Sequence, residues 1–386
     1  MDILTILFWV FTLLIGYSYF GYPIFLMLFS RLFGAKNNNT VPYNYPKVDI
    51  LIAAYNEDKV IKYKIENSLK LDYPEELMNI WIASDGSSDN TNKIVKEIAA
   101  KEENVHLLEY PRTGKSGVIN MALSELRGDI VVFSDANTMY DSQAIKLLIN
   151  NFSNEKVGCV CGKLVYQNPD ALISGEGESF YWKYETSLKI LESKVGYIAG
   201  ANGAIYSIRR SLFEPLPANT INDDFTISMR IVQKGYRSLY EENAAAYEDV
   251  APNMESEFRR HVRDGAGHYI AITHLIGLLN PLLGIKSFIY WSHRIIRWLV
   301  PFLLICLFAI NFLLSGLNMY KMFFFIQIGF YILAILGFLS VILGKRLYFF
   351  LYIPFYFCNL NLALFLGFVK AITNKQKPTW ERTDRT

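Results

Sequence analysis

Four stretches of the sequence contain no charged side chain, and each is long enough to cross a bilayer as a helix. About 20 apolar residues in a helix span the roughly 30 Å of membrane hydrocarbon. The first stretch lacks the basic start and the small residues of a cleaved signal peptide, so we expect it to remain as a membrane helix. The four stretches are Ile3–Ser30, Trp298–Tyr320, Met322–Gly344 and Leu347–Val369.

Between residues 47 and 134, short apolar runs alternate with segments of helical pattern. Strands that alternate with helices along the chain are typical of a parallel sheet with helices on both faces. We therefore predict a Rossmann-like, doubly wound α/β domain. The expected strands are Val48–Ala54, Met78–Ser84, Val105–Tyr110 and Asp129–Ser134, and the expected helices are Asp58–Leu69, Asn90–Lys101 and Ser116–Leu126.

After residue 150 strands and helices no longer alternate regularly. The runs 157–166 and 203–208 indicate strands, and 223–234 indicates a helix, so the expected sheet is mixed but mainly parallel. A helix over about 253–273 carries basic residues beside apolar ones, which suits a helix in the membrane interface. The expected divisions are an N-terminal membrane helix (1–36), an α/β domain (37–252), interfacial helices (253–290), C-terminal membrane helices (291–372) and a tail (373–386).

Basic residues beside the apolar stretches indicate the side of the membrane on which the domain lies. Lysine and arginine are enriched on the cytoplasmic side of membrane spans. Four basic residues flank the domain side, so we expect a multi-pass protein of the cell membrane with a cytoplasmic domain. These residues are Arg31, Lys36, Arg294 and Arg297.

The topology is ambiguous at residues 347–369. Three late spans would put the tail outside, although the tail carries five basic residues. The stretch contains Pro354, Asn359 and Asn361, so the alternative is a re-entrant or interfacial segment, which would keep the tail in the cytoplasm. The five basic residues are Lys370, Lys375, Lys377, Arg382 and Arg385.

Composition agrees with a membrane protein and argues against nucleic acid as a partner. Hydrophobic residues make up 52% of the chain, and charged residues make up 19%. The charged share lies below the usual quarter of a soluble protein. The formal net charge of +2 is too small to attract a nucleic-acid backbone. We expect the lipid bilayer, and no nucleic acid, among the partners.

Polar motifs follow three of the predicted strands where each strand ends. They are Tyr55-Asn56-Glu57, Ser84-Asp85-Gly86 and Asp135-Ala136-Asn137. The carboxyl ends of parallel strands meet at one edge of a sheet, and ligands bind there. Carboxylate and amide oxygens are ligands that Mg²⁺ and Mn²⁺ accept. Farther along, Asp223 and Asp224 are adjacent, which favours a raised pKa for one of them and suits a general base.

The order of these motifs resembles that of the family-2 inverting glycosyltransferases. The likeness is strongest to the membrane-integrated branch with the cellulose, hyaluronan and poly-N-acetylglucosamine synthases. It implies a GT-A fold and a UDP-sugar donor, with a hexose or N-acetylhexosamine transferred with inversion to a growing surface polysaccharide. It also implies Mg²⁺ or Mn²⁺ as cofactor. The matching segments are 48–57, Ser84–Asp89, Gly114-Lys115, Asp135-Ala136-Asn137 and Asp223-Asp224.

The resemblance assigns a role to each matching residue near the donor. Ala53, Tyr55 and Glu57 match the first nucleotide-binding segment, and Asp85 matches the acid that recognises uracil. Lys115 matches a lysine near the donor. Taken singly, an Asp-Gly-Ser motif also fits an ordinary turn, and Lys115 fits a solvated loop lysine.

The family's metal and base motifs match with one departure. Asp135 faces the ribose or the metal, and Asn137 stands where the family has a second aspartate. An amide oxygen can bind the metal but brings no charge, which puts metal affinity and metal choice in question. Asp224 matches the base that takes the acceptor proton, next to Asp223. Helix capping is the structural alternative for these acids.

On the acceptor side the resemblance is partial. Arg260 to Asp264 lie where polymer-forming members carry Gln-x-x-Arg-Trp; Arg263 keeps the arginine that contacts the diphosphate, and the tryptophan is missing. Gly200 and Asn202 match a glycine-rich segment beside the acceptor. The tail resembles a gating loop that closes over the nucleotide, through Trp380, Thr383 and Arg385.

Two other functions remain open. Transfer of one sugar to a lipid-phosphate carrier or glycolipid is favoured by the missing tryptophan, which removes the usual sugar-stacking platform. A membrane scaffold or transporter with a degenerate nucleotide domain is the non-enzyme alternative. The apolar stretches hold no charge for an ion path, and Asp85, Asp135 and Asp224 are intact, which argues against that alternative.

Overall fold

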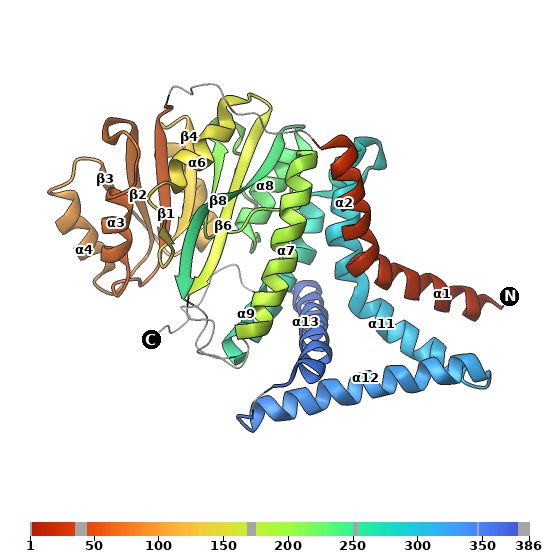
Figure 1. Cartoon of the computed structure of the whole chain (residues 1–386). Helices are drawn as coiled ribbons and strands as arrows, with labels where there is room; N and C mark the ends of the chain where they lie inside the picture. Colours follow the sequence, from red (N-terminus) through yellow and green to blue (C-terminus); the bar gives the residue numbers. More distant parts are fainter. Residues whose placement is uncertain (1, 35–44, 168–174, 250–253, 346, 377–386) are drawn as a thin grey trace.

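The computed structural model describes residues 2–34, 45–167, 175–249, 254–345 and 347–376. Figure 1 shows an α/β part at one end of the molecule and long helices at the other, with α7 and α9 between them. The chain therefore has the two parts that the hydrophobic pattern predicts, an α/β part and a helical part.

One eight-stranded mixed sheet forms the α/β part, in the order β3-β2-β1-β4-β7-β6-β8-β5. The neighbours β3, β2, β1 and β4 are parallel, as predicted. The direction reverses at β7, which is antiparallel to both β4 and β6, while β6 and β8 are parallel. The strands are β1 (Val48–Ala54), β2 (Met78–Asp85), β3 (Val105–Tyr110), β4 (Ile130–Asp135), β5 (Met139–Tyr140), β6 (Val157–Gln167), β7 (Tyr206–Arg209) and β8 (Arg237–Asp249).

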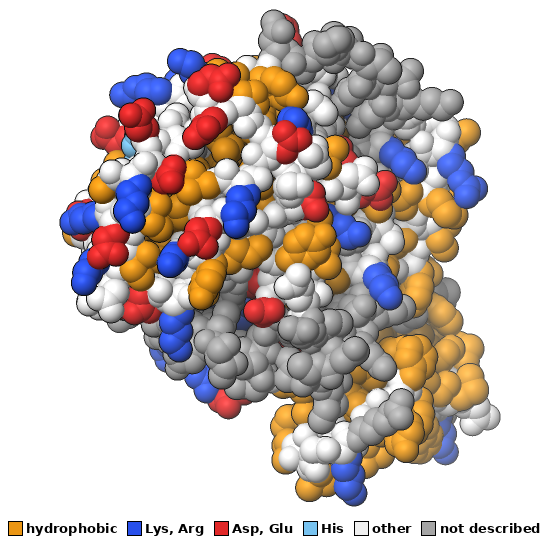
Figure 2. All heavy atoms as spheres, turned by 60° about the vertical axis from the view of Figure 1, so that its left-hand side comes forward, with side chains coloured by type: hydrophobic (Ala, Val, Ile, Leu, Met, Phe, Trp, Pro, Cys, Tyr) orange, Lys and Arg blue, Asp and Glu red, His pale blue; other side chains and the backbone are white. Residues whose placement is uncertain are grey.

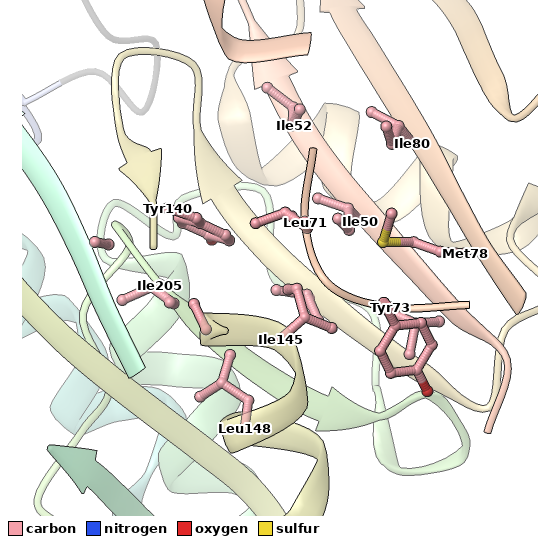
Figure 3. Close-up of a cluster of buried hydrophobic side chains, with 14 of the residues drawn as sticks. Ile50, Ile52, Leu71, Tyr73, Met78, Ile80, Tyr140, Ile145, Leu148 and Ile205 are labelled. Carbon is pink, nitrogen blue, oxygen red and sulfur yellow. The ribbon is translucent and has the colours of Figure 1, made fainter. Parts of the chain in front are cut away.

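Helices cover both faces of this sheet, because successive side chains of a strand point to opposite faces. In β1, Ile50 and Ile52 pack with residues of α3, α4 and α6, whereas Leu51 packs with residues of α5 and α8 on the other face. Figure 3 shows the first of these clusters, which extends from Ile80 of β2 past Ile50 of β1 to Ile145 and Leu148 of α6. The helices are α3 (Ile61–Leu69), α4 (Thr91–Ala99), α5 (Lys115–Glu125), α6 (Ala144–Asn150) and α8 (Asp223–Gln233).

Two long elements are absent from the sequence prediction, helix α7 (Gly175–Val195) and strand β8. Helix α7 shows no apolar stripe because several of its buried positions are polar, among them Glu185, Lys189 and Glu192. Strand β8 contains acidic residues and three successive alanines, which have low strand propensity. Its long parallel ladder with β6 overrides that preference.

Four helices of the described residues are long and apolar enough to cross a membrane. Elements α10, η8 and α11 follow one another without a break. The second candidate therefore begins at Ile285, earlier than the charge-free stretch that begins at Trp298. Figure 2 shows charged side chains scattered over the α/β part and a hydrophobic surface on the lobe below it. The candidates are Ile3–Phe33 (α1, Ile3–Gly16; η1, Tyr17–Gly21; α2, Tyr22–Phe33), Ile285–Leu313 (α10, Ile285–Ile289; η8, Tyr290–Ile295; α11, Ile296–Leu313), α12 (Asn318–Ile342) and α13 (Phe349–Ile372).

The position of helix α13 bears on which side of the membrane the tail lies. It is one continuous helix despite Pro354. It packs on α9 (Met254–His274), and Figure 1 shows α12 lying across the ends of α11 and α13. Lys370, Lys375 and the acidic residue Asp224 line one cavity, so the end of α13 lies on the side of the α/β part.

A buried network of charged residues joins the helical part to α7. His293 of η8 lies 2.6 Å from Glu192 and 3.2 Å from Glu185, and Arg297 of α11 also pairs with Glu185. Tyr22 of α2 donates to Glu192 at 2.6 Å. Arg297 thus forms a buried ion pair, although the sequence analysis counts it among the basic residues that predict the cytoplasmic side. Removing one member of a buried pair costs about 3–5 kcal/mol, so this network fixes α2, α7 and α11 together.

Candidate active site

Three acidic residues and a lysine converge at the carboxyl ends of the strands. Asp135 is the last residue of β4, and Asp223 and Asp224 open α8. Lys115, the first residue of α5, donates to Asp135 at 2.7 Å and lies 3.7 Å from Asp223. A Cβ atom on Gly203 would lie 3.4 Å from Asp135 Oδ2 and Lys115 Nζ, and 3.5 Å from Asp224 Oδ2. Gly203 therefore lies at the meeting point of these groups.

The adjacent acids differ from ordinary surface carboxylates. Burial, and then the neighbouring Asp223, raise the pKa of Asp224 to about 7 against the pull of Lys115. Burial also raises the pKa of Asp223, while Lys115 lowers it. A carboxylate with a pKa near neutrality can hold and release a proton under physiological conditions, as a general base must. The Asp224 carboxylate also accepts from the Phe225 backbone N–H at 2.7 Å, whereas the N-cap of α8 is Asn222, which forms no side-chain capping bond.

Lys115 is held between acids rather than solvated. Burial lowers the pKa of its amine, but Asp135 and Asp223 outweigh burial and raise the pKa above its usual value. The ammonium of Lys115 thus stays charged beside Asp135, where it is available to pair with a diphosphate.

Asp135 and Asn137 supply two oxygen donors at the end of β4. Both side chains are partly exposed and line the same cavity. Among the described residues, no group of three or more His, Cys, Asp or Glu side chains is arranged to hold a metal. Mg²⁺ is typically held by one or two protein oxygens together with substrate phosphates, and this donor set fits such a shared site.

The Asp85 carboxylate is fully buried at the end of β2. It accepts from the backbone N–H of Thr113 at 2.6 Å and of Gly114 at 3.0 Å, and it pairs with Arg112. The guanidinium of Arg112 lies 3.3 Å from the centre of the Tyr55 ring. Asp85 therefore holds the turn that leads into Lys115, and Arg112 covers Tyr55, an arrangement that the sequence did not predict.

A cavity of about 1,720 Å³ runs from these groups into the helical part. At one end it is lined by Ala53, Glu57 and Lys115. Its middle passes Asp224 and the stacked rings of His268 and Trp298, whose centres are 4.8 Å apart. The far end lies among the candidate membrane helices and is lined by Tyr19, Phe20, Ile24, Phe330, Ile353 and Tyr356.

Two of the expected acceptor residues, Arg260 and Asn202, line this cavity, and so does Arg263, which is expected at the donor diphosphate; Gly200 does not line it. Arg263 lies 3.6 Å from Asp264, and Arg260 donates to Tyr166 at 3.3 Å. The Asn202 amide donates to the Gly162 carbonyl. Gly200 has a φ of +102°, which favours glycine. The predicted gating residues Trp380, Thr383 and Arg385 lie outside the described residues.

Sequence reasoning missed several residues of the site. Arg112 precedes the matched Gly114-Lys115 pair by two residues, so its position was the available signal. In the sequence Trp298 begins a charge-free apolar stretch, and nothing there connects it with His268. Lys64 was one of several lysines of a surface-like helix, yet it is fully buried, and burial lowers its pKa to about 7.

Comparison with known sequences agrees with the motif analysis. Residues 49–215 match the family model described as Glycosyl transferase family 2. The chain is 28% identical over 244 residues to the probable glycosyltransferase YdaM of Bacillus subtilis, covering 60% of this chain and 57% of that protein. It is 25% identical over 224 residues to the poly-beta-1,6-N-acetyl-D-glucosamine synthase of Staphylococcus aureus, covering 57% and 54%. The matches thus span little more than half of these relatives.

Comparison with solved structures supports the fold. A mannosyltransferase from Pyrobaculum calidifontis, solved in complex with GDP-Man and Mn²⁺, aligns with 96% of this chain and 99% of its own, at a TM-score of 0.69 and 19% identity. The mixed sheet is thus of the GT-A kind, as the motif resemblance predicts. Residues 49–215 therefore carry a family 2 glycosyltransferase domain.

Proposed function

We propose that this protein transfers a hexose or N-acetylhexosamine from a UDP-sugar, with inversion, to a growing surface polysaccharide at the cytoplasmic face of the cell membrane. The observation that carries the proposal is the convergence of Asp135, Asp224 and Lys115 around Gly203. Asp224 acts as the general base, and its neighbours Lys115 and Asp135 lie at the donor diphosphate. The likeness to a Staphylococcus aureus polysaccharide synthase supports the choice of acceptor.

In this mechanism Asp224 removes the proton from the acceptor hydroxyl as that oxygen attacks the anomeric carbon. The bond from the anomeric carbon to the diphosphate oxygen breaks on the opposite face, which inverts the configuration. The raised pKa of Asp224 makes it a stronger proton acceptor than an ordinary aspartate. The proton then passes from Asp224 to solvent when the product leaves.

The donor diphosphate lies on the side of Gly203 opposite to Asp224. The Lys115 ammonium exchanges its contact with Asp135 for one with the departing phosphate, and Arg263 approaches from α9. Asp135 and Asn137 would hold Mg²⁺ or Mn²⁺, which would neutralise charge that develops on the leaving group. The Mn²⁺ in the Pyrobaculum mannosyltransferase complex supports a divalent ion here. The uracil ring of the donor stacks near Tyr55. Because Arg112 covers the Tyr55 ring, Arg112 must shift to admit it.

A second candidate is transfer to a lipid-linked acceptor, and one feature of the cavity favours it. Its far end is lined by Phe20 and Ile24, whose side chains are largely exposed on the membrane helices. A cavity that opens sideways toward hydrocarbon can admit an apolar chain from the bilayer. A polyprenyl phosphate lying there would present its head group toward Asp224.

The test is incubation of the purified protein in lipid nanodiscs with a panel of UDP- and GDP-sugars and either Mg²⁺ or Mn²⁺. We expect one UDP-sugar to release UDP, and a glycan primer to be extended to long products. A single sugar on added polyprenyl phosphate, with no extension of the primer, would select the second candidate. If no donor releases nucleotide with either acceptor, both candidates are wrong.

A further inference from the structure

One buried lysine lines the cavity and takes no part in the mechanism above. Lys189 of α7 is only 6% exposed, and it lines the cavity together with Trp182 and Glu185 of the same helix. Residues three and four positions apart lie on one face of a helix, so these three side chains share the face that borders the cavity. Within the described part of the chain, the Lys189 ammonium forms no hydrogen bond and no ion pair.

The two acidic residues nearest to Lys189 along α7 are engaged elsewhere. Glu185 lies four residues earlier, the usual spacing for an ion pair on a helix, but it pairs with Arg297. Glu192 lies three residues later, and its carboxylate is 2.6 Å from His293. Burying an ammonium without a partner costs far more than burying a neutral side chain of the same length. The charge of Lys189 is therefore the feature that needs explanation.

The Lys189 ammonium lies near the segment that is expected at the acceptor. Burial raises the pKa of the Cys161 thiol, whereas Lys189 lowers it and Asp224 raises it, so both charged groups lie near this thiol. The Asn202 amide donates to the same sulfur at 3.3 Å. Lys115, on the donor side, is the cation that lowers the pKa of Asp224. Lys189 thus supplies a second cation, on the acceptor side of the base.

The protein provides no carboxylate that compensates this second cation. In the described residues, none of the acidic side chains that line the cavity forms an ion pair with Lys189. Arginines pair with three of these acids, as Glu185–Arg297, Glu255–Arg259 and Asp264–Arg263. A bound anion would compensate the ammonium, whereas a neutral sugar would leave its charge buried and unpaired.

We propose that Lys189 binds an anionic group of the acceptor, a carboxylate or a phosphate at or beside the attacking oxygen. This inference rests on the proposed function, because it takes Asp224 as the base that faces the acceptor. The acceptor is then an acidic glycan or a lipid-linked phosphate rather than a neutral sugar chain. The ammonium donates charge-assisted hydrogen bonds to the anion and so holds the attacking oxygen toward Asp224.

The experiment measures acceptor binding without any donor, by titrating the purified protein in nanodiscs with two matched pairs of probes. One pair is a trisaccharide that ends in glucuronic acid and the same trisaccharide ending in glucose. The other pair is a polyprenyl phosphate and the matching polyprenol. Binding is followed by tryptophan fluorescence, because Trp182 and Trp298 line the cavity.

The variants remove or keep the charge at position 189. They are Lys189→Met, Lys189→Gln and Lys189→Arg, and the control is Lys194→Met, an exposed lysine in the last turn of α7. We expect wild type, Lys194→Met and Lys189→Arg to bind the anionic member of one pair roughly tenfold more tightly than its neutral member, as a hydrogen bond between charged groups provides. Lys189→Met and Lys189→Gln should bind both members with the affinity of wild type for the neutral one.

The pair that shows the preference identifies the anion as a carboxylate or a phosphate. Equal wild-type affinity for both members of both pairs would overturn the inference, whether or not the variants fold. A preference that Lys189→Met or Lys189→Gln retains would also overturn it, because another group would then bind the anion. The proposed function fails by a different result, the absence of nucleotide release throughout the donor panel.

Discussion

The pH dependence of turnover follows from the pair Asp223–Asp224. Burial and the neighbouring Asp223 raise the pKa of Asp224 from 3.8 to about 7. A base works only when deprotonated, so activity is lost as the pH falls through the pKa. With a pKa of about 7, roughly one tenth of Asp224 is ionised at pH 6 and nine tenths at pH 8, so kcat should rise about tenfold between them.

Replacing Asp223 by asparagine tests the cause of this shift. Asp223 is the second largest contribution to the raised pKa of Asp224, after burial. Removing its charge should lower the pKa of Asp224, so the acid limb of the kcat profile should move to lower pH by about one unit. The limb belongs to the coupled pair, so its midpoint is compared between variants rather than assigned to one residue.

The assay is UDP release at saturating donor between pH 5 and pH 9, in wild type, Asp223→Asn and the control Asp72→Asn. Asp72 is an exposed aspartate before β2 that pairs with Lys146. The control should keep the wild-type profile. An acid limb below pH 5 in wild type, or a limb that Asp223→Asn leaves in place, would refute the reasoning.

The remaining predictions concern three single substitutions. Asp224→Asn should lower kcat by roughly 10²-fold or more without weakening UDP binding. Because the folded-state pKa of Asp224 is raised, its ionisation destabilises the fold as pH rises toward 8; the same variant should therefore be more stable than wild type at pH 8, by on the order of 4 kcal/mol, and equal near pH 3 in thermal melts. Asp85→Ala leaves Arg112 and two backbone N–H groups without their buried acceptor, so it should cost about 3–5 kcal/mol of stability and raise the donor KM. Asn137→Asp should lower the Mn²⁺ concentration that gives half-maximal activity, and activity that survives complete EDTA treatment would remove the metal role.

Much of the parallel half of the fold could be predicted from the sequence. Strands β1, β2 and β4 are buried on both faces, so they read as continuous apolar runs, and their polar motifs fall at the carboxyl ends by rule. The strand-end rule and the family resemblance both indicate Asp135, whereas Asp224 is indicated by the resemblance and by its adjacency to Asp223. Strands β6 and β7 overlap the predicted runs 157–166 and 203–208, whereas β8 was missed because it is rich in polar residues.

Other features depend on tertiary contacts that no local pattern records. Helix α7 buries Glu185 and Glu192 because His293 and Arg297 meet them from η8 and α11, far along the chain. Lys64 is buried only because the segment after β4 folds over α3. The contact between Arg112 and Tyr55 joins two loops whose spacing in sequence gives no sign of it.

The central claim is that Asp224 activates the acceptor for attack with inversion at the anomeric carbon. The most direct measurement is proton NMR of the anomeric signals during turnover of an α-linked UDP-sugar by wild type and Asp224→Asn. We expect a β-linked product that accumulates as UDP appears with wild type, and a rate lower by roughly 10²-fold or more with the variant. An α-linked product, or a variant that turns over at the wild-type rate, would contradict it.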